Sequence, residues 1–438
     1  MEYLPIIFFV VVLIFLLMGF PVAFTLGGVS FIFGVFTFGL KFFNLLPLRV
    51  WGIMSNYVLI AVPLFIFMGV MLEKSGIAEE LLETMALLFG KLRGGLAISV
   101  LVVGALLGAS TGIVGATVVT MGVISLPVML KRGYHPRAAS GVIMASGTLG
   151  QIIPPSIILV LLGSVLNVPV GELFIGAVIP GIMLVFLYLV WIVILSFIRP
   201  DSVPAMPKSE LDKFTGAVKW KRIFKAFILP FSLVVAVLGS IFAGIASPTE
   251  AAALGAFGAT LLTVIRKRFN LKILKAVMLK TTSITSMAFM ILVGATAFSL
   301  VFRGMHGDIY LSNWILSSNL EPHYFLAIVM LVIFVLGFFI DFIEITFIVI
   351  PVVAPIFVHL HFDLLWIGIL IAMNLQTSFL TPPFGFAIFY LKGVAPEGVS
   401  TSHLYRGIVP YVVIQIIALS ILLYWPDIVL WLPKIIKP

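Results

Sequence analysis

Long apolar segments separated by short polar stretches run through almost the whole chain. A helix that crosses a lipid bilayer needs about 20 mostly apolar residues, and several segments approach or meet that length. The clearest are Leu4 to Met18, Val22 to Leu40, Val58 to Leu72, Gly176 to Ile198 and Ile408 to Trp431. Lipid leaves backbone groups without an outside hydrogen-bond partner, so these segments must form helices packed in a bundle. The pattern predicts an all-α polytopic membrane protein.

The composition agrees with lipid as the solvent. Of the 438 residues, 62% are hydrophobic and 10% are charged, which is more apolar surface than one soluble core buries. The net charge of +9 comes from basic residues in short loops, so it indicates topology and not nucleic-acid binding. By the positive-inside rule we expect four segments to be cytoplasmic: Lys91 to Arg93, Lys131 to Arg137, Arg266 to Lys280 and the connector Arg199 to Lys225.

An internal repeat divides the chain. Leu126-Pro127 and Ala354-Pro355 are each followed by a double proline, Pro154-Pro155 and Pro382-Pro383, and both pairs are 228 residues apart. Weaker pairs at nearly the same offset are Pro21 and Pro248, Gly28 and Gly255, and Gly69 and Gly294. Two halves of similar plan follow, residues 1–198 and 226–438.

The relative orientation of the halves depends on the segment 96–130. Gly108 to Gly115 interrupts its apolar run, and both flanks are basic. We expect a re-entrant helix hairpin that enters and leaves on the cytoplasmic side, with its tip at Ser110 to Gly115. The first half then crosses five times, and this odd number inverts the second half. Its counterpart hairpin, 323–360, breaks near Gly337 to Asp341 and has few cations at its ends.

Two further helices, 138–166 and 365–392, are expected to be broken at membrane depth. They contain Ser146 to Ser156 and Asn374 to Phe384, each with the tandem proline. Proline removes backbone donors and frees carbonyls one turn earlier, and carbonyls with nearby hydroxyls suit Na⁺, while half-helix N-termini attract a carboxylate. The alternative is that double prolines only kink packed helices, but their repetition at one offset favours function.

Ionisable residues inside apolar stretches are costly in lipid, so a function is their default interpretation. Asp341 lies where the second hairpin should meet the substrate, and Glu344 shares its helical face as a second ligand, a proton carrier or a packing partner. Glu250 in Ser247-Pro-Thr-Glu250 is read as a helix cap. The candidate substrate-binding residues are Asp341, Glu344, Ser146, Gln151, Asn374 and Gln376.

Other charged positions are given structural interpretations. Arg303 lies near a helix end, and Arg303, Gly304, His306 and Asp308 are placed in an outward loop, as solvated surface or as a contact to a partner protein. Glu73 to Glu83 forms an amphipathic cytoplasmic stretch, with a solvated helix face preferred over a position at the membrane interface. The chain has no cysteine, no P-loop motif and no metal-enzyme histidine spacing. We therefore expect no catalytic residue, no organic cofactor and no metal besides a coupling ion. An intramembrane enzyme would need a nucleophile and base, which only Asp341 and Glu344 approach, and a channel suits the interrupted hairpins less well.

Six motifs in this order resemble the large membrane subunit of the tripartite ATP-independent periplasmic (TRAP) transporters, of the dicarboxylate-transporter M (DctM) type, over essentially the whole chain. The motifs are Gly19 to Ala23, Val62 to Gly69, the tip 108–112, Gly147 to Ser156, Ser247 to Ala251 and Leu380 to Pro383. A stand-alone ion-coupled carrier of the divalent-anion symporter or arsenite-permease type is the alternative.

The resemblance implies an inverted-repeat elevator transporter that imports a small organic anion with Na⁺. The substrate is a carboxylate such as a 2-oxo acid, a hydroxy acid or a dicarboxylate. The implied partners are a small four-helix membrane subunit on a separate chain and a periplasmic binding protein. The location is the bacterial inner membrane with both termini periplasmic. The scaffold comprises 1–95, 173–225 (with the connector), 226–322 and 393–438, and the transport part comprises 96–172 and 323–392.

The resemblance also implies two sodium sites. The first corresponds to Ser110, Thr111, Gly147 and Gly150, and the second to Gly337, Ser378 and Thr381. The family often carries Ser-Gly-Ser-Ser at the first tip, whereas this chain has Thr111-Gly-Ile-Val114, so coordination there would depend on backbone carbonyls. Gln376-Thr-Ser378 stands where many members have a glycine, which resembles a branch associated with 2-oxo acids, lactate or related hydroxy acids.

Overall fold

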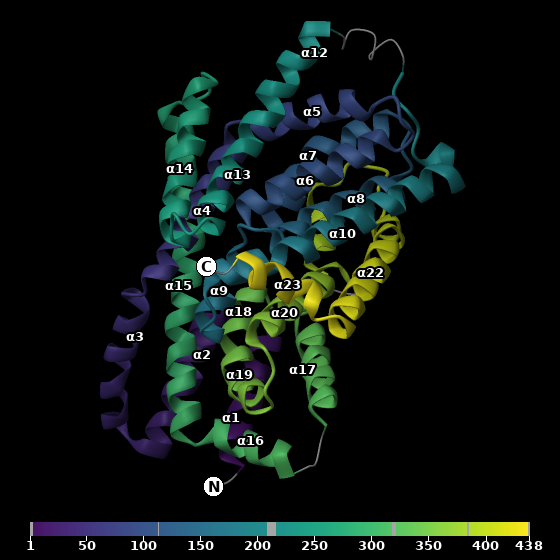
Figure 1. The fold of residues 1–438 in the computed structure, drawn as a ribbon. Coiled ribbons are helices and arrows are strands. Elements are labelled where there is room, and N and C mark those ends of the chain that lie inside the picture. Colours follow the sequence, from purple (N-terminus) through teal and green to yellow (C-terminus); the bar gives the residue numbers. More distant parts are fainter. Residues whose placement is uncertain (1–2, 113, 208–215, 318–320, 383–384, 437–438) are drawn as a thin grey trace.

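The computed structural model describes residues 3–112, 114–207, 216–317, 321–382 and 385–436, and its regular structure there is helical (Figure 1). The first half contains α1 (Leu4–Leu17), α2 (Val22–Phe38), η1 (Leu40–Leu45), α3 (Leu46–Met54), η2 (Tyr57–Ile60), α4 (Ala61–Lys74), α5 (Ile77–Phe89), α6 (Gly95–Thr111), α7 (Val114–Lys131), α8 (Pro136–Thr148), η3 (Leu149–Gln151), α9 (Ile157–Leu166) and α10 (Val170–Ile198). After η4 (Pro200–Ser202), the second half contains α12 (Gly216–Ile223), η5 (Phe224–Ile228), α13 (Leu229–Phe242), α14 (Pro248–Ile265), α15 (Leu271–Gly304), α16 (Gly307–Ser317), α17 (Pro322–Leu336), α18 (Phe342–Ile348), α19 (Ile350–His359), α20 (Leu364–Leu380), α21 (Phe386–Val394), α22 (Thr401–Tyr424) and α23 (Asp427–Ile436).

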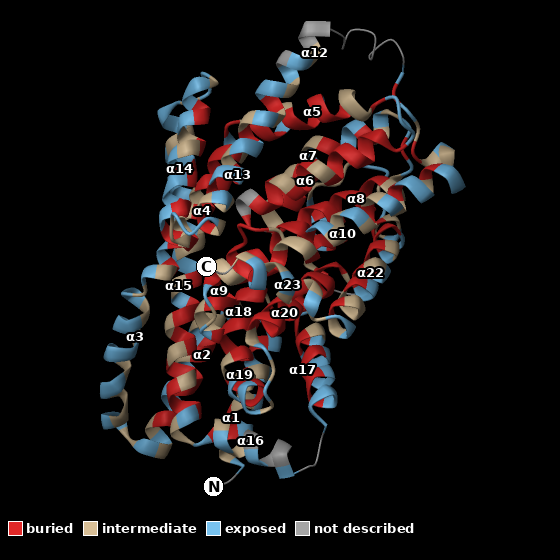
Figure 2. Cartoon of the chain, in the orientation of Figure 1, coloured by how far each residue is buried: buried red, intermediate tan, exposed pale blue. Residues whose placement is uncertain are grey.

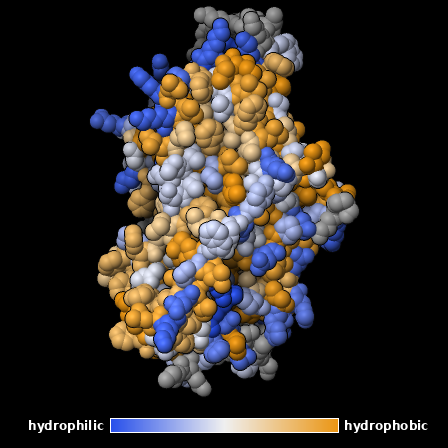
Figure 3. Space-filling view, turned by 90° about the vertical axis from the view of Figure 1, so that its left-hand side faces the viewer, coloured by the Kyte–Doolittle hydropathy of each residue, from blue (hydrophilic) through white to orange (hydrophobic). Residues whose placement is uncertain are grey.

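The outer surface is that of a polytopic membrane fold. Seven helices in the described ranges are long and apolar enough to cross a membrane, or up to eight if the bent pair α18 and α19 counts as one span. Exposed residues cover the outer sides of the helices (Figure 2), and many are large apolar side chains such as Phe36 and Phe197. Figure 3 shows hydrophobic residues over much of the face of α3, α14 and α15, with hydrophilic ones at the end where α12 lies and again in the lower half of the view.

The two halves follow the same order of elements. The helices α6, α8, α9 and α10 begin at residues 95, 136, 157 and 170, and α17, α20, α21 and α22 begin at 322, 364, 386 and 401. The offset therefore stays between 227 and 231, close to the 228 of the prolines. The halves also exchange partners: α2 packs on α15 and α4 on α14, while α9 packs on α18 and α19 and α21 packs on α7. The relative inversion of the halves stays a prediction.

Both predicted hairpins are present as antiparallel helix pairs. In the first, α6 ends at Thr111, Gly112 turns with φ +61°, and α7 returns. The two outer ends meet where the Leu96 backbone N–H donates to Tyr134 Oη at 3.2 Å. In the second hairpin, the ring of Phe325 of α17 packs against that of Phe357 of α19 in a tilted arrangement, with ring centroids 5.3 Å apart. The α18 and α19 pair is bent by 53°, with Pro351 in the first turn of α19. Re-entry from one membrane side stays a prediction.

Three expectations about helix boundaries were wrong. The span Ile408 to Trp431 is divided, because Pro426 keeps Trp425 out of the helical region (φ −126°, ψ 77°) and α23 begins anew. The basic segment Arg266 to Lys280 is a loop only as far as Asn270, whose side chain accepts from the Ile273 N–H at 2.8 Å and starts α15. Arg303 lies in the last turn of α15 and Asp308 in the first turn of α16, so only Met305 and His306 separate these helices.

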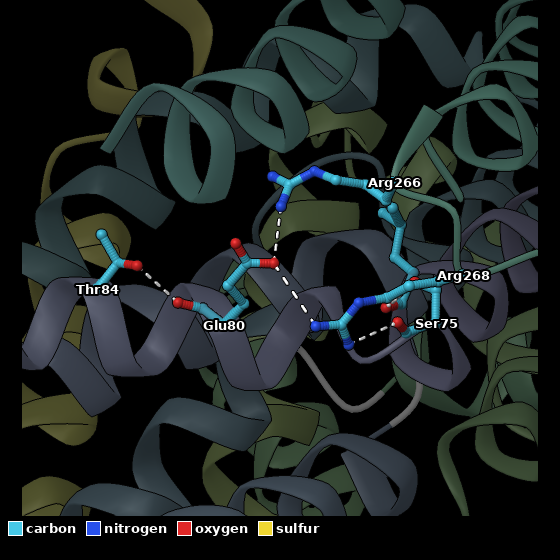
Figure 4. Close-up of polar contacts among 6 residues, drawn as sticks. Ser75, Glu80, Thr84, Arg266 and Arg268 are labelled. Atoms are coloured by element: carbon cyan, nitrogen blue, oxygen red, sulfur yellow. Dashed lines mark hydrogen bonds and ion pairs between the residues drawn. The ribbon is translucent and has the colours of Figure 1, made fainter. Parts of the chain in front are cut away.

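Of two expectations about charged segments, the helix cap is confirmed, whereas the single amphipathic stretch Glu73 to Glu83 is divided, because α4 ends at Lys74 and α5 begins at Ile77. Ser247 and Glu250 form a reciprocal cap at the start of α14, with the Ser247 N–H donating to Glu250 at 2.8 Å. The stretch around Glu80 is the amphipathic helix α5. Its Glu80 carboxylate bonds Arg266 at 2.7 Å and lies 3.8 Å from Arg268, which in turn donates to the Ser75 carbonyl (Figure 4). These contacts tie α5 to the end of α14, so its charged face is partly engaged rather than simply solvated.

Candidate functional site

Each hairpin tip meets the broken helix of its own half through a glycine. A Cβ added at Gly108 of α6 would lie 2.8 Å from the backbone nitrogen of Gly150, so these two backbones are in contact. Gly147 packs in the same way on Val118 of α7. In the second half, a Cβ on Gly337 would meet the side chain of Ser378. The structure thus brings together Gly150 with the first hairpin and Gly337 with Ser378, as the site prediction required.

The hydroxyl groups near the breaks donate their protons within their own helices. Ser378 donates to the Leu375 carbonyl at 2.8 Å and Thr381 to the Thr377 carbonyl at 2.7 Å. Ser146 donates to the Ile143 carbonyl at 3.0 Å. Because each proton is used within the helix, the oxygen lone pairs remain to accept or to coordinate, which suits a hard cation. The side chains of Ser110 and Thr111 lie outside the described ones, although both residues belong to α6.

Two buried amides lie close to the same breaks. Gln151 in η3 and Gln376 in α20 are fully buried, and their amide oxygens and nitrogens have no hydrogen-bond partner among the described residues. A buried amide without partners costs about 1–3 kcal/mol for each polar group, so these side chains are poised for a ligand or for water. Asn374 differs, because it donates to the Met330 carbonyl of α17 at 2.7 Å and thereby links α20 to the hairpin.

Asp341 and Glu344 act locally as a helix cap. Asp341 accepts from the Phe342 N–H at 2.7 Å, and Glu344 accepts from the Asp341 N–H at 3.1 Å. The reciprocal pair starts α18, so the structure places them at the tip of the second hairpin as predicted. Asp341 also lines a cavity of about 500 Å³.

That cavity is where the interrupted elements of both halves converge. Its wall includes Gly115 at the start of α7, Ile157 at the start of α9 and Tyr390 of α21. The opposite wall comes from α4 and α15, with Glu73, Lys74 and Lys280. Two ammonium and two carboxylate groups therefore share one cavity whose remaining surface is largely apolar. Such a site can hold a small polar anion through a few directed contacts.

A second cavity of about 440 Å³ lies farther along α15. The first cavity uses Lys280 to Ala288 of this helix and the second uses Leu292 to Arg303. Its basic residues are Arg49 of α3 and Arg303, and the far end of α18 contributes Phe347. Because α18 begins in one cavity and ends in the other, this short helix lies between them.

Sequence reasoning missed the basic residues of these cavities. Lys280 and Arg303 were assigned to loops, yet both lie on α15, whose 34 residues exceed the bilayer thickness. Lys74 lies within the stretch predicted to have a solvated face, and the sequence pattern predicts no role for Tyr390. The polar residues along α15 could have predicted these cavities from the sequence. Each of them lines one cavity or the other: Lys280, Ser283, Thr296, Ser299 and Arg303.

The sequence is similar to that of a known family of membrane transport proteins. The family described as "Tripartite ATP-independent periplasmic transporter, DctM component" matches residues 9–428. C4-dicarboxylate TRAP transporter large permeases of Pseudomonas aeruginosa and Vibrio cholerae are each 30% identical, over 89% and 98% of this chain and 89% and 97% of theirs. An ectoine TRAP transporter large permease of Halomonas elongata is 29% identical over 95% of this chain and 96% of its own.

A solved structure supports the same fold. The YdaH transporter of Alcanivorax borkumensis aligns with a TM-score of 0.64 over 97% of this chain and 98% of its own, at 14% identity. The relatives are transporter permeases and not enzymes, and the apolar helices agree with a multi-pass protein of the bacterial inner membrane. The chain therefore belongs to the DctM component family, the large permeases of tripartite ATP-independent periplasmic transporters.

Proposed function

We propose that this chain carries a small organic anion into the cell together with Na⁺, and that a hydroxy acid fits its site better than a plain dicarboxylate. The charge arrangement around Asp341 carries this proposal. Glu73 lies 3.6 Å from Lys74 and balances it, whereas Lys280 makes no ion pair within the described part of the chain. A substrate carboxylate would pair with Lys280, and a substrate hydroxyl would donate to the Asp341 carboxylate. A second substrate carboxylate beside Asp341 would be repelled.

Na⁺ is the proposed coupling ion, bound at two places. The second site would use the Ser378 and Thr381 hydroxyl oxygens with the Gly337 carbonyl, since both hydroxyl protons are used within α20. The first would use backbone carbonyls near Gly147 and Gly150 of the broken helix, together with Ser110 and Thr111 at the tip of the first hairpin. Gln151 and Gln376 stay proposed amide contacts to the substrate, although both are fully buried and neither lines the cavity of Asp341 and Lys280 in this conformation.

Transport would follow an elevator motion between the two cavities along α15. Packing supports one change to the expected partition, because α10 and α22 contact α6, α8 and α20 extensively, and the Gly141 and Gly407 backbones touch. We therefore propose that α10 and α22 move with the hairpins, while α2, α4, α14 and α15 form the fixed part. Both chain ends are proposed to be periplasmic. For the N-terminus this agrees with α1 lying at the end opposite α12, whereas the C-terminal end lies near the middle of the molecule (Figure 1).

The remaining parts of the system are proposed to be a small four-helix membrane subunit and a periplasmic binding protein. The test is uptake of labelled lactate, pyruvate and succinate into proteoliposomes that contain both membrane subunits. Uptake should require an inward Na⁺ gradient and the binding protein, and lactate should be preferred; a K⁺ gradient of equal size is the control. Equal uptake without the binding protein would support a stand-alone carrier, and uptake without Na⁺ would contradict ion coupling.

A further inference from the structure

A compact basic pocket lies far from the transport cavities, at the end of the molecule that the basic loops assign to the cytoplasm. Its volume is about 140 Å³, and its lining includes Arg137, Arg199 and Arg406 together with His135. These side chains come from the start of α8, the end of α10 and the start of α22. No acidic residue is among the described residues that line it. Three elements distant in sequence thus bring cations to one place, with Arg199 and Arg406 exposed and Arg137 half-buried, and this cluster attracts anions.

No described acidic residue of the chain neutralises these three arginines. Within the described ranges, none of the three takes part in an ion pair, and the Arg137 Nε is buried without a hydrogen-bond partner. Asp201 is exposed two residues from Arg199 and does not pair with it. A buried guanidinium nitrogen without a partner is costly, so an acceptor bound beside the Arg137 Nε would be favoured.

The two histidines beside the pocket add donors rather than acceptors. His135 Nδ1 accepts from the Arg137 N–H at 3.2 Å, and His403 Nδ1 accepts from the Ser400 N–H at 3.2 Å. Each neutral ring therefore has only its Nε2–H to offer. The pKa of His135 is lowered by burial first and then by Arg137, His403 and Arg199, so the fixed charge at neutral pH rests on the arginines.

The lower wall of the pocket is apolar and continues into the lipid-facing surface. Trp191, Leu195 and Tyr411 line it. Beside it, Phe197 is 81% exposed and Val413 is 49% exposed. A pocket of this size holds a phosphate group but not acyl chains, which would lie along these exposed side chains. Tryptophan at such a boundary is typical of the membrane interface.

We propose that this pocket binds the phosphate headgroup of an anionic phospholipid from the cytoplasmic leaflet. The three arginines hold the phosphate oxygens, the imidazoles donate to them, and the acyl chains pack on α10 and α22. Basic pockets between membrane helices on this side recognise such headgroups. Because α8 and α22 meet here at the contact of Gly407 with the Arg137 carbonyl, the lipid would clamp these helices together.

The test uses the full-length chain purified in detergent, with retained lipid measured by native mass spectrometry and thermal unfolding as a second readout. The probes are phosphatidylglycerol, phosphatidylcholine and inorganic phosphate. Removing two cations in Arg199→Gln/Arg406→Gln should weaken phosphatidylglycerol binding about 25-fold, roughly fivefold for each arginine. Arg222→Gln, an exposed arginine of α12 outside the pocket, is the matched control and should bind like the parent.

Three results would overturn the proposal. One is equal phosphatidylglycerol retention by the double variant and the control. Another is equal stabilisation by phosphatidylcholine, which would show that net anionic charge does not matter. The third is full protection by inorganic phosphate alone, which would make the pocket a site for a free anion. If the double variant does not give a monodisperse protein, Arg406→Gln alone replaces it, with an expected weakening of about fivefold.

Discussion

In the first half of the molecule the hairpin touches its broken helix through two glycines, whereas in the second half a glycine faces a serine. Gly108 and Gly150 leave only backbone atoms at the contact, while Gly337 lies against the Ser378 side chain. The positions correspond, because Gly150 and Ser378 are 228 residues apart. The contact between hairpin and broken helix therefore consists of backbone atoms alone in the first half. In the second half it includes a side chain that can change its rotamer and that carries a hydroxyl group.

The same contrast holds for charge. The second hairpin returns through the cap formed by Asp341 and Glu344, whereas Ala116 occupies the position that corresponds to Glu344 in the first. Substrate chemistry is therefore expected to concentrate in the second half. The first half should contribute mainly shape and backbone oxygens.

The largest effect is expected from filling the joint between the two glycines. In Gly150→Ala the new Cβ would lie 2.6 Å from the Gly108 Cα, and neither backbone can rotate away. We expect uptake to fall at least 100-fold and stability to fall by about 1–3 kcal/mol, measured by proteoliposome uptake and thermal unfolding. Gly28→Ala is the control, since nothing lies within 4 Å of that position.

In the second half, a second substitution should restore the stability that an alanine at the glycine removes, whereas in the first half no side chain is available to be shortened. Gly337→Ala meets a side chain, so Gly337→Ala/Ser378→Gly should restore folding stability toward the parent. Failure of this rescue, or a harmless Gly150→Ala, would show that the two joints do not differ as described.

The next effect separates the charge of Asp341 from its capping role. Asp341→Asn keeps an oxygen that can accept from the Phe342 N–H, whereas Asp341→Ala removes it. We expect both variants to reduce lactate uptake about 10- to 100-fold, but only the alanine variant to lose about 0.5–2 kcal/mol of stability. Pyruvate, which lacks the hydroxyl, should be affected less than lactate. Normal lactate uptake by Asp341→Asn would leave Asp341 as a cap alone.

The sequence predicted the features that depend on neighbouring residues in the chain, but not those that depend on packing between distant segments. The hairpin tips and breaks followed from Gly, Ser and Pro runs, because these residues act on the backbone where they stand. The Asp341 and Glu344 spacing was itself that of a capping pair, yet the high cost of charge in lipid drew the interpretation toward binding. The cavity residue Lys280 was not predicted, because its place depends on packing between α15 and elements distant in sequence.

A smaller effect is expected from the hydroxyl that distinguishes the joints. Ser378→Ala removes an oxygen from the proposed second ion site while leaving the helix intact. We expect the Na⁺ concentration for half-maximal uptake to rise about three- to tenfold, since one of several ligands is lost. Ser146→Ala in the first half, where backbone oxygens are proposed to dominate, should change it less than about twofold. Equal shifts in both variants would remove the distinction between the sites.

The smallest functional effect is expected at the base of the hairpins, where the halves again differ. Tyr134 fastens the first hairpin through its hydroxyl, whose pKa burial raises to about 12, so it stays protonated at neutral pH. Tyr134→Phe leaves the Leu96 N–H without that acceptor and should cost about 1–3 kcal/mol, seen as a lower unfolding midpoint with uptake within about twofold of the parent. Phe325→Leu, at the aromatic base of the second hairpin, is the matched variant. A loss of uptake comparable to that of Gly150→Ala would mean that transport depends on the hairpin base as strongly as on its tip.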